Sequence, residues 1–162
     1  VERRSFLALV IGMISTGIAG LLGVTVGRYV IEPSLAGSAG EQWVDAGMLA
    51  EIPEGAAVRR KVAVSREIGW GKQVVEEAVW IRRNNDKVEV FSSVCPHLGC
   101  TINHTSEGFA CPCHQSRWNE QGQKTGGPTP RDMDRFESRI EDGVLRVRHQ
   151  SFKQGSPEKE AV

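Results

Sequence analysis

The clearest hydrophobic pattern lies at the start of the chain, where the 23 residues from Ser5 to Gly27 carry no charge. Arg4 precedes this run and Arg28 follows it. A helix of that length spans roughly 35 Å, which is enough to cross a bilayer core of about 30 Å. A cleaved signal peptide is the alternative, but its apolar region is usually shorter, at about 7–15 residues. The pattern therefore predicts an uncleaved transmembrane helix within residues 1–31.

The residues before this run, Glu2 to Leu7, combine an arginine pair, one variable residue and then Phe-Leu. This order resembles the twin-arginine export signal. An arginine pair is also the ordinary positive charge at the cytoplasmic end of a membrane helix. Both interpretations place the N-terminus in the cytoplasm, and everything after Arg28 on the outer, periplasmic side of a bacterial cytoplasmic membrane.

Residues 32–41 form the next segment, and Leu35 is their only large apolar side chain. The remainder is rich in Gly, Ser and Ala, a composition that favours flexible coil. We therefore expect a hinge linker between the membrane helix and the rest of the chain.

From residue 42 the pattern changes to short β-like runs, and Asn84-Asn85-Asp86 and Asp142-Gly143 are typical of tight turns. The pattern predicts an all-β head at 42–150, an antiparallel sandwich with a loop-rich excursion from about 95 to 130. The polar residues 151–162 are expected to form a frayed tail. The predicted strands are Val58–Val64, Val74–Ile81, Val88–Val94, Gly108–Ala110, Arg135–Ile140 and Val144–Val147.

Charge and composition add two restrictions. The chain has 20 basic and 20 acidic residues, so nothing indicates a nucleic-acid partner. All four cysteines lie between residues 95 and 113, and three of the four histidines lie between 97 and 114, as ligands that converge on a metal must. His104 and His149 stand outside the motifs described next and are expected to be exposed polar residues.

Two short boxes contain the candidate chemistry: CPHLGC at 95–100 and CPCHQS at 111–116. Each supplies cysteine thiolates and a histidine, so two loops can hold one metal centre between them. Where two histidines replace two cysteines on one iron of a [2Fe–2S] cluster, the reduction potential rises by several hundred millivolts. A tetrahedral zinc site is the alternative for such ligands. Spare thiols beside the metal ligands, which oxidise in an exported protein, are unusual at zinc sites and favour the cluster.

The two boxes resemble those of the Rieske iron–sulfur proteins of cytochrome bc and b6f complexes. The resemblance implies a Rieske-type head on one membrane helix, with one [2Fe–2S] cluster. It also implies the following site: ligands Cys95, His97, Cys111 and His114, of which His97 and His114 are the catalytic residues; a disulfide between Cys100 and Cys113; and the neighbours Leu98, Ser116, Trp118, Gly127 and Pro128.

The neighbours have distinct implied roles. Leu98 matches the residue that shields the cluster near the quinone pocket. Ser116 matches the serine whose hydroxyl binds a cluster sulfide. Gly127-Pro128-Thr129-Pro130 resembles the proline loop that forms a third wall of the site.

Three residues depart from the family pattern. Pro96 stands where threonine is usual, Gln115 where glycine is usual, and Trp118 where a tyrosine hydroxyl donates to a ligand sulfur. Losing a hydrogen bond to sulfur makes reduction less favourable. We therefore expect a lower potential than in tyrosine-bearing relatives, which suits menaquinol better than ubiquinol.

The resemblance implies an electron-transfer subunit of a quinol–cytochrome oxidoreductase in the membrane. Such a subunit takes an electron and a proton from quinol and passes the electron to a c-type cytochrome. The implied partners are a b-type cytochrome subunit and a c-type cytochrome in a hetero-oligomeric complex, for which a dimer is one arrangement. The alternative is the small Rieske subunit of an arsenite-oxidase-like molybdoenzyme, which relays electrons without a quinol site.

Overall fold

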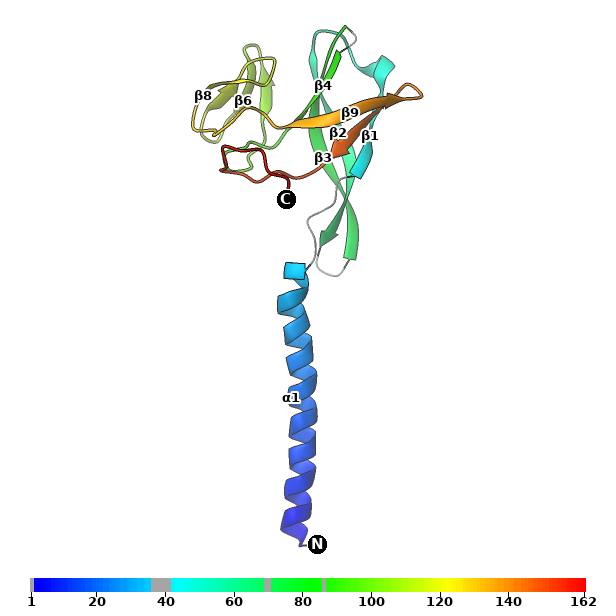
Figure 1. Ribbon diagram of the computed structural model, residues 1–162, viewed down its shortest axis with the longest axis vertical. Coiled ribbons are helices and arrows are strands. Elements are labelled where there is room, and N and C mark those ends of the chain that lie inside the picture. Colours follow the sequence, from blue (N-terminus) through cyan, green and yellow to red (C-terminus); the bar gives the residue numbers. More distant parts are fainter. Residues whose placement is uncertain (1, 36–41, 69–70, 86) are drawn as a thin grey trace. The chain divides into compact units, whose positions relative to one another are not determined.

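The computed structural model describes residues 2–35, 42–68, 71–85 and 87–162. The chain divides into two compact units, Val1–Gly37 and Ser38–Val162. The first unit contains one long helix and the second contains the β-strands (Figure 1).

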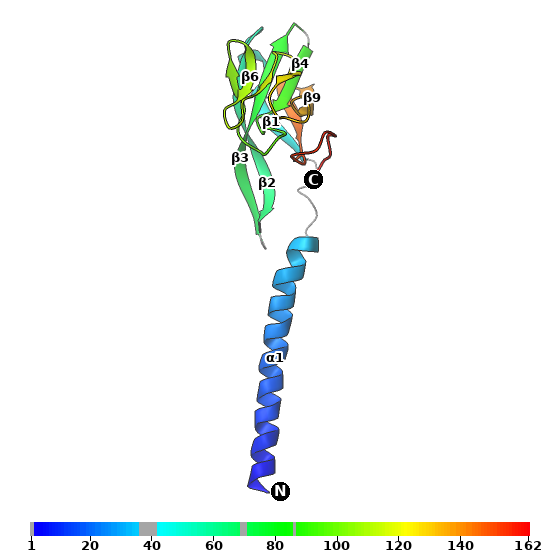
Figure 2. The ribbon, with the colours of Figure 1, turned by 90° about the vertical axis from the view of Figure 1, so that its left-hand side faces the viewer.

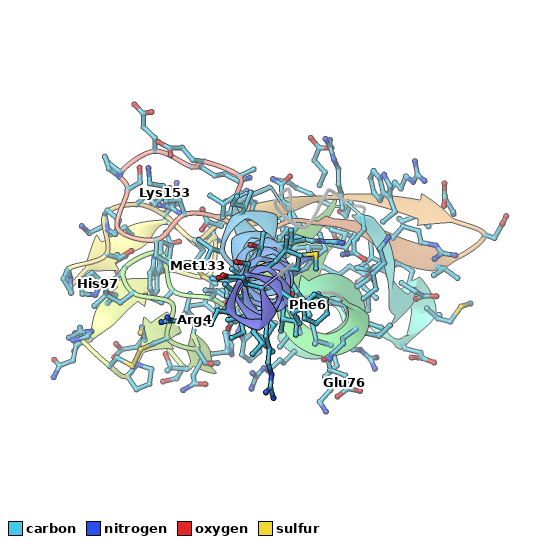
Figure 3. All side chains as sticks on the ribbon, turned by 90° about the horizontal axis from the view of Figure 1, so that it is seen from below. Arg4, Phe6, Glu76, His97, Met133 and Lys153 are labelled. Carbon is cyan, nitrogen blue, oxygen red and sulfur yellow. A yellow bond between two sulfur atoms is a disulfide. The ribbon has the colours of Figure 1, made fainter. Side chains whose placement is uncertain are left out.

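Helix α1 (Arg3–Leu35) forms where the uncharged run predicts it. Its segment Arg3–Ile31 is long and apolar enough to cross a membrane, and it buries none of its most apolar stretch against protein. Apolar side chains cover the whole circumference, and Arg4 and Phe6 project to different sides (Figure 3). The Thr25 hydroxyl donates to the Leu21 carbonyl oxygen at 2.8 Å, so this polar group is satisfied within the helix.

The C-terminal end of α1 lies further along the chain than predicted. The helix continues to Leu35, so the first four residues of the predicted linker are helical. Residues 36–41 lie outside the described residues, and the hinge stays a prediction.

The head consists of two antiparallel sheets, as predicted for a sandwich with an inserted excursion (Figures 1 and 2). The larger sheet has six strands in the order β1-β10-β9-β4-β3-β2, and the smaller one has four in the order β5-β6-β7-β8. The strands are β1 (Gln42–Met48), β2 (Ala57–Ile68), β3 (Gly71–Asn84), β4 (Lys87–Ser92), β5 (Asn103–Thr105), β6 (Gly108–Cys111), β7 (Ser116–Trp118), β8 (Lys124–Gly126), β9 (Arg135–Glu141) and β10 (Val144–His149).

The two edge strands of the larger sheet, β1 and β2, are linked by one side chain. Gln42 donates from Nε2 to the Ser65 carbonyl oxygen at 2.8 Å and accepts from the Ser65 N–H at 2.9 Å. The sheet therefore curls until its edges meet, which protects unpaired backbone groups at those edges.

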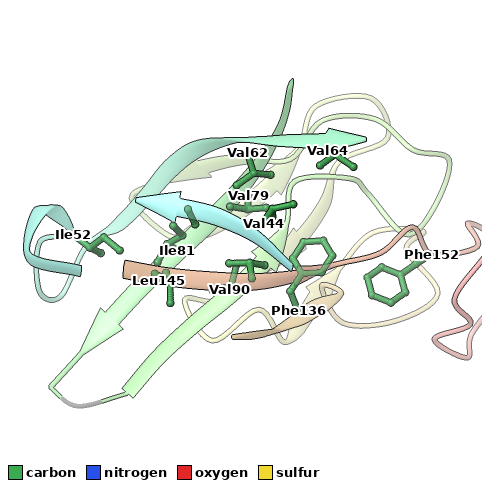
Figure 4. Packing of buried hydrophobic residues seen from close by; sticks show 12 residues of the cluster. Val44, Ile52, Val62, Val64, Val79, Ile81, Val90, Phe136, Leu145 and Phe152 are labelled. Atoms are coloured by element: carbon green, nitrogen blue, oxygen red, sulfur yellow. The ribbon is translucent and has the colours of Figure 1, made fainter. Parts of the chain in front are cut away.

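Alternating side chains of the curled sheet point inward and form the main core. On β2 the buried residues are Val62 and Val64, and the buried apolar residues of β10 are Leu145 and Val147. Figure 4 shows Val62, Val64 and Leu145 among the side chains that point into the interior of the curled sheet. The cluster consists of Val44, Ala46, Ile52, Val62, Val64, Val79, Ile81, Val90, Phe136, Leu145, Val147 and Phe152.

A second, aromatic core joins the smaller sheet to the larger one. Phe91 of β4 and Phe109 of β6 approach to 5.7 Å between ring centroids. The indole N–H of Trp80 donates to the Ile102 carbonyl oxygen at 3.0 Å, which leaves no unpaired polar atom on this buried ring. This core also contains Cys95 and Cys111, so both box loops start from a rigid base.

The tail does not fray, and that prediction is wrong. Phe152 is 5% exposed and its ring stacks on Phe136 at 5.7 Å. Backbone hydrogen bonds run from the Lys153 N–H to the Glu160 oxygen and from the Val162 N–H to the Ser151 oxygen. One buried aromatic ring anchors this otherwise polar segment.

The prediction of exposure is wrong for both outlying histidines. His149 is 5% exposed, and its Nε2 lies 3.2 Å from Glu77 Oε2. His104 is half-buried with its ring 5.0 Å from that of Phe109, and its Nε2 lies 2.9 Å from Glu120 Oε1. Each pairs with a carboxylate and packs an aromatic ring, so neither resembles a free surface histidine.

Candidate metal centre

The first box forms a tight loop after β4. The Gly99 N–H donates to the Cys95 carbonyl oxygen at 2.9 Å, and the Cys95 N–H donates to the Cys100 oxygen at 2.8 Å. Gly99 has φ +79°, which a glycine adopts without strain. The loop buries Cys95 and exposes Leu98, whose side chain is 64% accessible.

The second box forms the connection between β6 and β7. Cys111 ends β6 and faces Ser116, the first residue of β7, across the ladder. Gln115 has φ +58° in this connection. The left-handed conformation explains why glycine is usual at this position in the resembling family.

A disulfide between Cys100 and Cys113 joins the two loops, as predicted. The other two cysteines, Cys95 and Cys111, are buried free thiols. The Cys111 sulfur lies within 4.8 Å of both disulfide sulfurs. The disulfide therefore holds the loops together without using the thiols that a metal requires.

The two box histidines lie next to each other. The ring centroids of His97 and His114 are 4.9 Å apart, and the ring planes are nearly perpendicular at 88°. His97 is half-buried and His114 is exposed. The pair of imidazoles thus lies on the accessible side of the loops, whereas the two thiols lie on the buried side.

The surroundings of the buried Cys95 thiol disfavour its thiolate form as long as no cation is bound. The pKa of the Cys95 thiol is raised to about 11, mainly by burial and in addition by the adjacent Cys111 thiol. Hydrogen bonds from the backbone N–H groups of His97 and Leu98 lower this pKa and only partly offset the rise. Because a metal ligand must be a thiolate, bound iron would supply the positive charge that this site lacks.

The third wall of the site is the segment after β8. Gly127 has φ +81°, and a Cβ there would lie 2.4 Å from the Ser116 Cα. The Thr129 N–H donates to the buried Ser116 Oγ at 3.1 Å. This contact uses the hydroxyl oxygen as an acceptor and leaves its hydrogen to donate into the site. Pro128 is exposed beside it.

Trp118 is 1% exposed and forms the rear of the site. Its indole Nε1–H donates to the Arg131 carbonyl oxygen at 3.2 Å. The indole donor is therefore engaged by backbone, as expected if it does not replace the tyrosine hydroxyl of the family.

Arg131 and Asp134 were missed by sequence reasoning. The Arg131 guanidinium binds both Asp134 carboxylate oxygens at 2.9 Å, and the Arg131 side chain is only 9% exposed. In the sequence this pair is part of the charged stretch Arg131-Asp132-Met133-Asp134, which is typical of a surface loop. No pattern in the sequence marked it as buried.

Two thiols, two imidazoles and a linking disulfide on two loops fit a [2Fe–2S] cluster with mixed ligands. Residues 42–137 match the family described as the Rieske [2Fe–2S] domain. The chain belongs to this family, and it carries one [2Fe–2S] cluster of the Rieske type.

Two curated relatives align over most of the chain. The menaquinol:cytochrome c reductase iron–sulfur subunit of Bacillus subtilis (strain 168) is 25% identical, and the alignment covers 90% of this chain and 90% of that protein. The cytochrome b6-f complex iron–sulfur subunit of Chlorobaculum tepidum is 25% identical, with 90% of this chain and 75% of that protein covered.

One solved structure is similar to part of the chain. A cyanobacterial plasma-membrane Rieske protein from Synechocystis PCC 6803 is 19% identical with a TM-score of 0.46, and the match covers 65% of this chain and 99% of that one.

Proposed function

We propose that this chain is the Rieske electron-transfer subunit of a quinol–cytochrome c oxidoreductase. The observation that carries the proposal is the accessible His97–His114 pair, 4.9 Å between centroids, in front of two buried thiols. The name of the Bacillus subtilis relative gives menaquinol as its substrate and cytochrome c as its acceptor, and the alignment covers 90% of both chains.

The four ligands divide by chemistry. Cys95 and Cys111 would hold one iron as thiolates, and His97 and His114 would hold the other as imidazoles. When bound, the cluster supplies a one-electron acceptor whose potential is raised by the two neutral ligands. The Cys100–Cys113 disulfide keeps the two ligand-bearing loops at a fixed separation.

The histidines also receive the proton. A deprotonated ring nitrogen of His97 or His114 accepts a hydrogen bond from the quinol hydroxyl and takes its proton as the electron leaves. Leu98 follows His97 in the first box and is 64% exposed, and it provides an apolar surface for contact with a quinone ring. The Ser116 hydroxyl oxygen accepts from the Thr129 N–H, so its hydrogen would be available to donate to a sulfide of the bound cluster.

Menaquinol is the substrate that the site favours. The Trp118 indole donates to the Arg131 carbonyl oxygen, and so does not donate to a ligand sulfur. A cluster with fewer hydrogen bonds to sulfur has a lower potential. A low-potential cluster matches menaquinol, which is a stronger reductant than ubiquinol.

The membrane arrangement follows from α1. The chain crosses the membrane once through α1, with Arg3 and Arg4 on the cytoplasmic side and the head on the outer side. There the head meets a b-type cytochrome, which binds quinol, and a c-type cytochrome in a hetero-oligomeric complex. Protease added to sealed, outside-out vesicles should digest the head. Protection of the head would contradict this orientation.

The arsenite-oxidase-like alternative is not favoured. Both relatives reported above are named as subunits of menaquinol:cytochrome c reductase or cytochrome b6-f complexes. Purification from membranes in mild detergent separates the two functions, since the proposal requires a b-type cytochrome to co-purify. Co-purification with a molybdoenzyme instead would overturn it.

The ligand assignment has its own test. His114→Ala should abolish the Rieske signal in the electron paramagnetic resonance (EPR) spectrum of the reduced protein. The matched control is His104→Gln, which changes a histidine of the same small sheet outside the boxes. A Rieske signal that survives His114→Ala would refute the assignment.

A further inference from the structure

The C-terminal segment forms a small hairpin against the first box loop. The Gly155 N–H donates to the Pro96 carbonyl oxygen at 2.8 Å. The Gln154 side chain lies over Gly99, 4.0 Å from the position that a Cβ would occupy there. In the view of Figure 3, Lys153 and His97 are on the same side of the head. The hairpin thus contacts the loop that presents His97 and Leu98.

The Arg131 side chain binds the backbone of this hairpin. Its guanidinium donates to the Lys153 carbonyl oxygen at 2.9 Å and to the Ser156 carbonyl oxygen. The same guanidinium is neutralised by Asp134, whose side chain is 5% exposed. A buried, bidentate pair with two further carbonyl acceptors uses nearly the whole donor set of an arginine.

The backbone of Arg131 points the opposite way, into the cluster site. Its carbonyl oxygen accepts from the Trp118 indole at 3.2 Å and from the Thr129 hydroxyl at 3.1 Å. One residue therefore links the rear and the third wall of the site to the hairpin. The hairpin continues this connection to the first box through Gly155 and Pro96.

Two further contacts hold the hairpin to the larger sheet. Phe152 belongs to the main core. Lys159 donates from Nζ to the Arg135 carbonyl oxygen at 2.6 Å, and Nζ lies 4.6 Å from the centroid of the Phe152 ring. The segment is thus attached to the larger sheet near both ends of the hairpin.

We propose that the hairpin Ser151–Val162 and Arg131 are positioning elements that hold the first box loop, and with it His97 and Leu98, in the geometry required at the cluster. The inference rests on the proposed function for the role of that loop. In physical terms, the hairpin and Arg131 keep the first box loop in one conformation. The backbone N–H groups of His97 and Leu98 bind the Cys95 sulfur. Because the hairpin contacts Pro96 and Gly99 of the same loop, we expect these N–H groups to lose their alignment when the hairpin is released.

The test uses the full cluster-loaded chain and two variants. One variant ends after Gln150, and the other is Arg131→Met, which keeps the side-chain length but loses every contact of the guanidinium. The matched control is Arg135→Met, because the Arg135 side chain binds Glu89 and Gln121, whereas the hairpin hydrogen-bonds its backbone carbonyl oxygen, which the substitution keeps. Arg131→Met decides the matter if the truncated chain does not fold.

Two readouts separate positioning from simple stability. Amide hydrogen exchange at residues 97–99 should accelerate at least about tenfold in both variants, because each loses more than one hydrogen bond behind the loop. The midpoint potential should fall in both, because donors to the cysteine sulfur loosen. Unchanged exchange and potential in Arg131→Met, relative to Arg135→Met, would overturn the proposal. A wild-type chain without a Rieske EPR signal would instead overturn the proposed function, which separates the two failures.

Discussion

At the residue scale, Gly127 is the position where the smallest change should have a large effect. Gly127→Ala adds a Cβ that would lie 2.4 Å from the Ser116 Cα, at a φ of +81°. The strained backbone alone costs about 1–3 kcal/mol, and the clash separates the third wall from the second box. We expect a lower melting temperature and faster loss of the cluster absorbance.

Gly126→Ala is the control for that prediction. The neighbouring glycine has open space around its Cβ position and no positive φ. Equal destabilisation by both substitutions would show that the close approach to Ser116 is not what requires glycine at 127.

The second prediction at this scale concerns Trp118. Trp118→Tyr should raise the midpoint potential, because a phenol hydroxyl can donate to a ligand sulfur whereas the indole donates to the Arg131 carbonyl oxygen. Trp118→Phe removes the indole donor without supplying a hydroxyl, and should not raise the potential. A redox titration with no rise in Trp118→Tyr would remove the basis for a lowered potential.

At the scale of elements, the disulfide should matter more for cluster retention than for the fold of the six-stranded sheet. Cys100 and Cys113 are 13 residues apart. A disulfide that closes a loop of that size lowers the conformational entropy of the unfolded chain, which stabilises the folded state by about 3 kcal/mol. The double variant Cys100→Ser/Cys113→Ser should therefore lose its cluster faster on heating, as measured by visible absorbance.

Both cysteines must be changed in that experiment. The Cys111 sulfur lies within 4.8 Å of both disulfide sulfurs, so a single remaining thiol would be in reach of a cluster ligand. Equal rates of cluster loss in the double variant and the wild type would contradict a clamping role.

Glu77 links strands β3 and β10 and should make the head sensitive to acid. The hydrogen bond from His149 is the main cause of its lowered pKa, and Arg66 lowers the pKa further. A lowered carboxyl pKa contributes stability above its unfolded value of 4.5, and that stability is lost as the pH falls through the lower folded value. In Glu77→Gln, the free energy of unfolding should therefore decrease less steeply as the pH falls below 4.5.

The neighbouring Glu76→Gln supplies the comparison for Glu77, because Glu76 pairs with Lys61 on the surface, with both side chains more than 60% exposed. Urea unfolding at neutral and acidic pH should separate the two variants. The same pH profile in both would contradict the role given to the His149 contact.

Most of the longer strands were predictable from the sequence, and β1 is the exception. The predicted strands Val58–Val64 and Val144–Val147 lie inside β2 and β10. They could be predicted because branched apolar residues occupy enough of their positions to show a pattern. Strands β5, β7 and β8 have three residues each, which is too short for any periodicity to appear. Strand β1 is longer but contains Asp45, Ala46 and Gly47, which are poor strand formers.

At the scale of the whole molecule, the parts that the sequence predicted are those encoded locally. The uncharged run predicted α1, and the two boxes predicted the disulfide that the structure contains. Long-range pairings were not predictable. Arg131 binds the carbonyl oxygens of Lys153 and Ser156, more than 20 residues away, and nothing near Arg131 in the sequence indicates this.

The ordered C-terminal hairpin is the clearest case. Its order depends on Phe152, a single buried aromatic residue in a mostly polar segment, and on acceptors that are backbone carbonyls. Backbone acceptors have no sequence signature, so a polar tail with one aromatic residue looks like a disordered one.

The proposed function requires that quinol reduces a cluster held by the two boxes, and this reduction can be measured directly. Menaquinol is added without oxygen to the oxidised complex, purified from membranes in mild detergent, and the EPR spectrum is followed within one turnover. We expect the Rieske signal to appear and a c-type cytochrome to become reduced, and we expect both changes to be lost in His114→Ala but kept in His104→Gln. A cluster that remains oxidised in the presence of menaquinol, although dithionite reduces it, would contradict the account.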